Sequence, residues 1–302
     1  MQKNKPLKIK NVALCFSGQV KKLELCYPYI KKNLLDHIGS YDIFCCEEDD
    51  ENLKKIKLLK PIKTKKIKSS EVDRIIEGKL KSLNKQNYKT IIYTESFSFN
   101  FRNIYQQLFK IDQSFKLLEK YMGEENISYK YFIRIRFDFF PLDGLKIEDF
   151  KIRKNEVVVP ILKGIRPENE IIDMFCITSD FLAFKSYCSL YSNFRNVVQK
   201  NISIKPTFFQ KLYFFFEKNY SNFFLFIFKK SNKKQNKLLR NLLGLTLLLP
   251  KMFYKDFKFK NKCNTEKAIF YHLKSENKLI RKEIINFVIV RSLTDGLLIF
   301  GK

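Results

Sequence analysis

The stretch YKYFIRIRFDFF, from Tyr129 to Phe140, points most directly to a fold. Its aromatic and β-branched residues favour an extended strand, in which side chains two apart point to the same face. Arg134, Arg136 and Asp138 are therefore expected to share one face. Because unpaired charge is costly to bury, this is either an edge strand with a solvated face or a strand that presents its charges to a ligand. Two guanidinium groups suit a diphosphate, and a carboxylate beside them suits a divalent cation.

The segments upstream of this stretch alternate between predicted strands and predicted helices. An apolar run over 9–16 is typical of a strand, apolar residues at three- and four-residue spacing over 23–38 predict a helix, and 41–46 is a second short strand. A β-α-β unit of this kind belongs to a parallel sheet. A third strand is expected over 62–67. The sequence thus predicts an α/β fold with a mostly parallel sheet flanked by helices.

A long helix and two further strands surround the charged stretch. Apolar spacing over 101–122 predicts a helix of about six turns, ended by Gly123, that leads into the charged strand. Strands are also predicted over 155–160 and 171–177. The second of these carries Asp173 among apolar neighbours, where a lone acid indicates either a ligand-binding residue or a bulge.

The character of the sequence changes beyond residue 200. Phenylalanine and leucine there alternate with lysine in short segments that favour helices. We therefore expect two parts, a catalytic or binding domain over 1–200 and a basic, aromatic-rich helical region over 201–302 that completes the fold. Such a region suits an anionic membrane surface, or it simply completes the core.

The composition narrows the class of protein. The chain has 58 Lys and Arg against 31 Asp and Glu, a net charge of +27, which favours anionic partners such as nucleotide phosphates, nucleic acid or an anionic leaflet. Seven cysteines without a CxxC pair are typical of buried thiols in a reducing compartment. Two histidines without zinc spacing disfavour a zinc site or a histidine-based hydrolase. No uncharged run reaches the roughly 18 residues of a membrane span, so we expect a cytoplasmic chain, peripheral at most.

Five segments carry a resemblance to a known group of enzymes. They are ALCFSGQVK (13–21), YDIFCC (41–46), YKYFIRIRFD (129–138), IIDMFCITSD (171–180) and TEKAIFYHLK (265–274). Together they resemble bacterial surface-polysaccharide glycosyltransferases of GT-A-like fold, in which an RxRxD segment stands where other GT-A enzymes have DxD. The resemblance implies a hexosyltransferase-like enzyme that moves a sugar from a nucleotide-sugar to an acceptor of lipopolysaccharide or capsule type.

The resemblance also implies roles for individual residues. It places the following residues at the nucleotide and its diphosphate: Ser17, Gly18, Gln19, Lys21, Arg134 and Arg136. Asp138 would hold a divalent metal, Mn²⁺ or Mg²⁺. Asp173 is the candidate base that deprotonates the acceptor hydroxyl, with Glu266 second, although Glu266 also fits an ordinary acidic residue in the first turn of a helix.

Two other hypotheses for the function stay open. Lys21 and Ile172 stand where the resembled group usually has Arg and often has Asn, so a catalytically inactive scaffold of the same fold is one alternative. A nucleic-acid-binding protein is the other, prompted by the charge and the aromatic residues. Dispersed basic residues and few arginines argue against nucleic acid. The expected partners are a nucleotide-sugar, a glycan or lipid-linked glycan acceptor, and an anionic membrane surface.

Overall fold

The computed structural model describes residues 6–18, 20–48, 51–81, 101–161, 171–194, 265–290 and 297–300. The chain divides into two compact units, of which the first comprises Met1–Leu83, Asn100–Lys200 and Cys263–Lys302. The second unit, Asn84–Phe99 and Asn201–Lys262, lies outside the described residues. Every element described below belongs to the first unit.

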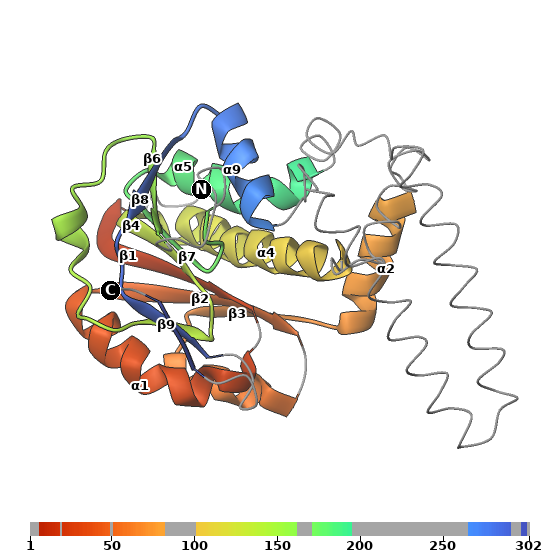
Figure 1. The fold of residues 1–302 in the computed structure, drawn as a ribbon, viewed down its shortest axis with the longest axis horizontal. Coiled ribbons are helices and arrows are strands. Elements are labelled where there is room, and N and C mark those ends of the chain that lie inside the picture. Colours follow the sequence, from red (N-terminus) through yellow and green to blue (C-terminus); the bar gives the residue numbers. More distant parts are fainter. Residues whose placement is uncertain are drawn as a thin grey trace, which may run out of the picture. The chain divides into compact units, whose positions relative to one another are not determined.

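A mixed sheet with the strand order β3-β2-β1-β4-β7-β6-β8 forms the centre of this unit (Figure 1). The strands are β1 (Lys8–Ser17), β2 (Tyr41–Glu48), β3 (Lys63–Ile67), β4 (Ile127–Ile135), β6 (Glu156–Pro160), β7 (Phe175–Thr178) and β8 (Leu279–Glu283). β1 to β4 run parallel, β7 is antiparallel to both of its neighbours, and β6 and β8 are parallel. The predicted α/β fold with a mostly parallel sheet flanked by helices is confirmed.

Helices cover both faces of this sheet. They are α1 (Leu23–Asn33), α2 (Ser69–Lys81), α4 (Phe101–Glu125), α5 (Phe181–Cys188) and α9 (Thr265–Ser275). α1 lies on one face, and α4 with α5 lies on the other (Figure 1). The alternation along β1 explains the two layers, because Leu14 and Phe16 pack in one core with Ile30 of α1, whereas the thiol of Cys15 donates to the Ser114 carbonyl of α4.

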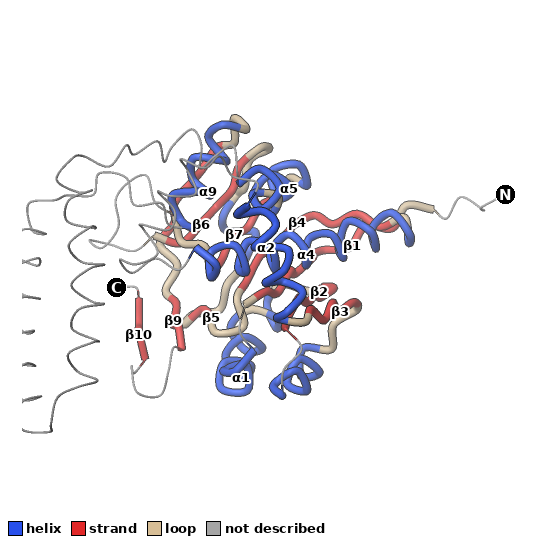
Figure 2. The backbone as a smooth tube through the Cα atoms, turned by 90° about the vertical axis from the view of Figure 1, so that its right-hand side faces the viewer, coloured by secondary structure: helices blue, strands red, loops and turns tan. Residues whose placement is uncertain are grey.

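A small antiparallel sheet joins residues that are far apart in the sequence. It consists of β5 (Phe139–Pro141), β9 (Phe287–Val290) and β10 (Leu297–Phe300), which lie side by side in Figure 2. Phe139 anchors it to the main sheet, since its ring lies 5.1 Å from the Phe175 ring and 4.8 Å from the Phe287 ring.

The predicted strand over Tyr129 to Phe140 is in fact two strands separated by a turn. β4 ends at Ile135, and the Phe139 N–H donates to the Arg136 carbonyl at 3.3 Å across the turn. The physical reason is that the registered pairing of β4 with β1 and with β7 ends at Ile135, so the chain can turn after it. The expectation that three charges share one face of one strand is therefore wrong, and only Arg134 lies within β4.

Smaller differences concern the ends of elements. α4 continues past Gly123, where it was expected to end, to Glu125, and the next residue, Asn126, has a left-handed φ of 52°. The predicted helix over 23–38 stops at Asn33, whose side-chain amide donates to the Pro141 carbonyl at 2.7 Å. Asp173 lies in a turn before β7 rather than within a strand or a bulge.

The region beyond residue 200 is only partly helical where the structure describes it. α9 is a helix, but residues 279–300 contain β8, β9 and β10, and β8 joins the main sheet. The prediction of a helical region over 201–302 is thus wrong for these strands, and a domain limit at residue 200 would cut through the first unit. The aromatic and lysine-rich part over 201–262 lies outside the described residues. Of the helices within the described ranges, none is both long and apolar enough to cross a bilayer.

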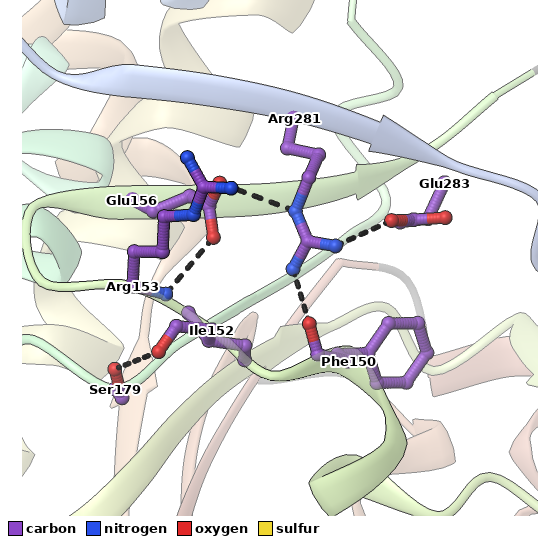
Figure 3. Close-up of polar contacts among 7 residues, drawn as sticks. All are labelled: Phe150, Ile152, Arg153, Glu156, Ser179, Arg281 and Glu283. Carbon is purple, nitrogen blue, oxygen red and sulfur yellow. Dashed lines mark hydrogen bonds and ion pairs between the residues drawn. The ribbon is translucent and has the colours of Figure 1, made fainter.

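An ion-pair network holds the edge strand β8 in place (Figure 3). The Arg281 guanidinium lies 3.1 Å from a Glu156 carboxylate oxygen of β6 and 2.5 Å from a Glu283 oxygen, and it donates to the Phe150 carbonyl. The same Glu156 side chain accepts the Arg153 backbone N–H at 3.0 Å. Because β8 directly follows α9, this network also fixes the position of α9.

Candidate functional site

The candidate site lies where β1 and β4 end side by side. From β1 the sheet extends through β2 and β3 in one direction and through β4 in the other, and ligands of open α/β sheets bind at the carboxyl ends of the strands at such a switch point. Gly18 follows β1 with a φ of 131°, which L side chains rarely adopt. A Cβ at this glycine would lie 3.6 Å from Cγ of Arg136, so the Arg136 side chain runs directly past it.

Arg136 and Asp138 form a two-pronged ion pair on the turn after β4. The Arg136 Nε donates to Asp138 Oδ1 at 2.8 Å, and Nη2 donates to Oδ2 at 2.6 Å. The side chains are 22% and 10% exposed, so the pair lies at the rim of the fold. Bidentate pairs of this kind are the strong form of the contact. Leaving Asp138 without its partner would cost about 1–3 kcal/mol for a partly buried carboxylate.

Asp173 comes to the same corner from the segment before β7. The Arg136 backbone N–H donates to the Met174 carbonyl at 3.0 Å, which joins the two segments. Asp173 is buried, and its Oδ2 accepts a hydrogen bond from the side-chain amide of Gln107 on α4. Gln107 was not predicted as a site residue, because a glutamine on a helix surface carries no sequence signal of its own.

Three carboxylates act electrostatically on the Arg136 guanidinium. Burial would lower the pKa of Arg136, but Asp138, Asp173 and Glu266 raise it above its ordinary value. Glu266 lies in the first turn of α9, as the helix-start reading predicted, and this position also brings it close enough to act on Arg136. Residues separated by about 130 positions in the sequence thus act on the same cation.

Arg134 occupies a different environment from Arg136. Its side chain is fully buried, and none of its three guanidinium nitrogens has a hydrogen-bond partner among the described residues. It acts electrostatically on the buried thiols of Cys15, Cys176 and Cys188. The structure therefore differs from the expectation that both guanidinium groups share one face and meet one diphosphate.

Buried thiols line the sheet, as the sequence predicted. Six of the seven cysteines are free and buried, and Cys263 lies outside the described residues. Burial raises the pKa of the Cys176 thiol to about 12, and it raises the pKa of Cys26 to about 12, with the Asp138 charge adding to the second. Neutral thiols at these positions behave as small apolar residues.

The remaining predicted residues surround Gly18. Ser17 is buried, and its hydroxyl has no hydrogen-bond partner among the described residues. Gln19 and the side chain of Lys21 lie outside the described residues. Lys22 is described on the short 3₁₀ helix Val20–Lys22, and like Asp138 it acts on the Cys26 thiol.

A second polar cluster, which the sequence did not predict, lies at the carboxyl ends of β2 and β3. Glu47 and Lys110 are buried there with a charge-to-charge distance of 3.6 Å. Lys65 of β3 donates to the Gln113 side chain at 2.5 Å. These contacts tie α4 to the edge of the sheet and so fix Gln107 one turn away on the same helix.

The donor atoms present do not fit a divalent cation in this arrangement. Both oxygens of Asp138 accept from Arg136, and one oxygen of Asp173 accepts from Gln107. Within the described ranges, no three His, Cys, Asp or Glu side chains gather in a way that could hold a metal ion. The Asp138 metal site thus remains a prediction that the geometry does not favour.

Comparison with known proteins places the chain in a family. No curated protein matches it. Residues 7–170, more than half of the 302 residues, match the family described as a domain of unknown function, DUF7796. The matched range contains Gly18, Arg136 and Asp138, whereas Asp173 and Glu266 lie beyond it. The chain therefore belongs to the DUF7796 family.

Proposed function

We propose that this chain is a glycosyltransferase of GT-A-like fold that moves a sugar from a nucleotide-sugar to a surface-glycan acceptor of lipopolysaccharide or capsule type. The observation that carries the proposal is the meeting of Arg136, Asp138, Asp173 and Glu266 beside Gly18, at the carboxyl end of β1. The sequence alone predicted all five of these residues, Gly18 included, as members of one site, and they come from four separate segments.

The position in the fold supports a nucleotide ligand. A glycine between the end of β1 and the first helix allows close approach of a phosphate, and backbone N–H groups at a helix start favour negative charge. Arg136 lies directly across this glycine. Asp138 engages two of the five N–H donors of an arginine, and three remain for phosphate oxygens.

The chemistry of sugar transfer matches the charges. In an inverting transfer the acceptor hydroxyl gives its proton to a carboxylate while its oxygen bonds to the anomeric carbon. The bond from that carbon to the diphosphate breaks, and its electron pair leaves on the phosphate oxygen. Arg136 would stabilise the departing diphosphate. Asp173, which Gln107 holds by one oxygen, would accept the proton through the other.

The setting of the acceptor is part of the same proposal. A lipid-linked glycan at an anionic, cytoplasmic membrane surface would be drawn to a chain of net charge +27. Flotation with vesicles of anionic and of neutral lipid tests this element separately. Binding to the anionic vesicles that salt abolishes is expected, and binding to neither kind would remove it.

A panel of nucleotide-sugars and free nucleotides tests the function. The panel includes UDP- and CMP-linked sugars. We expect one class of nucleotide-sugar to raise the melting temperature of the protein, because a ligand that binds the folded state stabilises it. Release of the nucleotide from that donor should follow. A stable complex without turnover would identify an inactive scaffold, and salt-dependent binding of duplex or single strands with no nucleotide-sugar response would favour a nucleic-acid-binding protein.

A further inference from the structure

The turn that carries Arg136 and Asp138 is anchored on both sides. Phe137 and Phe139, which flank Asp138, are fully buried. The Phe137 ring packs 5.5 Å from the Phe16 ring at the end of β1, and Phe139 packs between Phe175 and Phe287. The backbone hydrogen bond from Phe139 to Arg136 closes the turn. Buried residues therefore alternate with the two charged ones, and the ion pair is held on a rigid support.

This support commits Asp138 to Arg136. The two side chains lie two residues apart on a fixed turn, and both carboxylate oxygens are engaged. A cation bound mostly by phosphate oxygens would still need an oxygen of Asp138, and it would compete for that oxygen with the positive charge of the guanidinium. Both prongs of the Arg136 guanidinium end on Asp138, at 2.8 and 2.6 Å.

The carboxylates of this corner already act on one cation. Asp138, Asp173 and Glu266 all act electrostatically on Arg136. Lys22 adds a second positive charge nearby, since it acts on the Cys26 thiol as Asp138 does. A divalent cation bound to Asp138 would lie beside the Arg136 guanidinium, which repels it.

We propose that donor binding by this chain is independent of a divalent cation, with Arg136 as the phosphate-binding residue and Asp138 as the positioning residue that orients its guanidinium. This inference rests on the proposed function. The fixed guanidinium takes the place at the diphosphate that the RxRxD resemblance assigns to a metal on Asp138. The planar guanidinium offers directed N–H donors to the phosphate oxygens. A metal ion held by one carboxylate would not supply such directed donors.

Titration of nucleoside diphosphates and CMP in EDTA and in Mn²⁺ or Mg²⁺ tests the inference on the full chain. For the nucleotide that binds, we expect dissociation constants in EDTA, in Mn²⁺ and in Mg²⁺ that agree within about threefold. Mn²⁺ alone should show no saturable binding. A cation that tightens binding by about tenfold or more, through Asp138, would overturn the inference while leaving the proposed function intact. Binding of no nucleotide in any condition would overturn both.

Two conservative variants separate positioning from metal ligation. Asp138→Asn keeps the size of the side chain but loses the charge and one acceptor. The affinity for the nucleotide should therefore fall about fivefold to tenfold, and the factor should be the same in EDTA and in Mn²⁺. Loss of affinity confined to the Mn²⁺ condition would identify a metal ligand.

Arg136→Lys keeps the charge but loses the planar fork of donors and should weaken nucleotide binding about tenfold or more. Arg153→Lys is the matched control, because Arg153 is exposed and its backbone N–H donates to Glu156 rather than to the turn.

Discussion

The interior of the sheet around Arg134 and its carboxyl edge around Arg136 place the same side chain in opposite surroundings. Arg134 is enclosed by thiols and has no hydrogen-bond partner among the described residues, whereas Arg136, two residues later, is paired, partly exposed and surrounded by carboxylates. The difference arises because the β4 ladder ends at Ile135. The chemistry available to an arginine is therefore decided by where its strand stops being paired.

The largest expected effect concerns the carboxylate at the edge. Asp173→Asn removes the proposed base but keeps the hydrogen bond to Gln107 possible, so transfer from the donor that the panel identifies should fall about 10²–10⁴-fold. Nucleotide affinity should change little. Single-turnover rates and binding titrations measure the two separately. Asp149→Asn, an exposed carboxylate on the 3₁₀ helix Ile147–Phe150, is the control. Turnover at the wild-type rate in Asp173→Asn would assign the base elsewhere.

The next effect contrasts the two arginines through stability. Arg134→Met replaces a buried, unpartnered charge with an apolar side chain of similar length, which is often neutral or stabilising by about 1–4 kcal/mol. Arg136→Met strips Asp138 of its partner and should lower the free energy of unfolding by about 1–3 kcal/mol. Urea unfolding of both variants at neutral pH measures this difference. A strong loss of stability in Arg134→Met would mean that the interior guanidinium has a partner that balances its charge.

The smallest effect is a pH dependence that arises away from both arginines. Burial lowers the pKa of His272 below its usual 6.5, while Glu276 and the Ser186 backbone act in the opposite direction. The unfolded chain then takes up a proton near pH 6.5 that the folded chain refuses, so stability falls as the pH drops below 6.5 and is unaffected above it. The urea midpoint should therefore be lower at pH 5.5 than at pH 7.5.

His272→Asn should reduce this acid sensitivity, because the amide can keep the hydrogen bond to Ser186 without titrating. His37→Asn is the matched control, since His37 is the only other histidine and it is exposed. Urea midpoints at the two pH values compare them. Equal acid sensitivity in His272→Asn and wild type would show that carboxylates alone cause it.

Local patterns predicted much of this fold. β1, β2, β3 and β6 lie within one or two residues of their predicted positions, because each is a short run of strand-forming residues bounded by turn signals. β8 and β9 were missed, since they pair with β6 and β5, which lie far away in the sequence, and β10 was missed with its neighbour β9. The end of β4 at Ile135 has the same origin, as it depends on where β1 and β7 stop.

The candidate site was predictable to a similar degree. Charged residues within apolar runs identified Arg136, Asp138 and Asp173, because such residues need a partner inside the fold. The sequence could not show that Asp138 would be engaged by Arg136 rather than by a metal ion, because both contacts require the same residue types. Gln107 and Lys110 escaped notice because polar residues on a long helix are usually solvated.

The affinity of a nucleoside diphosphate for Arg136→Met and for Arg134→Met, measured in EDTA beside the wild type, tests the central claim most directly. The account predicts that Arg136→Met weakens binding about thirtyfold or more, while Arg134→Met stays within about threefold of the wild type. Wild-type affinity in Arg136→Met, or an equal loss in both variants, would contradict the claim that the guanidinium at the edge of the sheet binds the diphosphate.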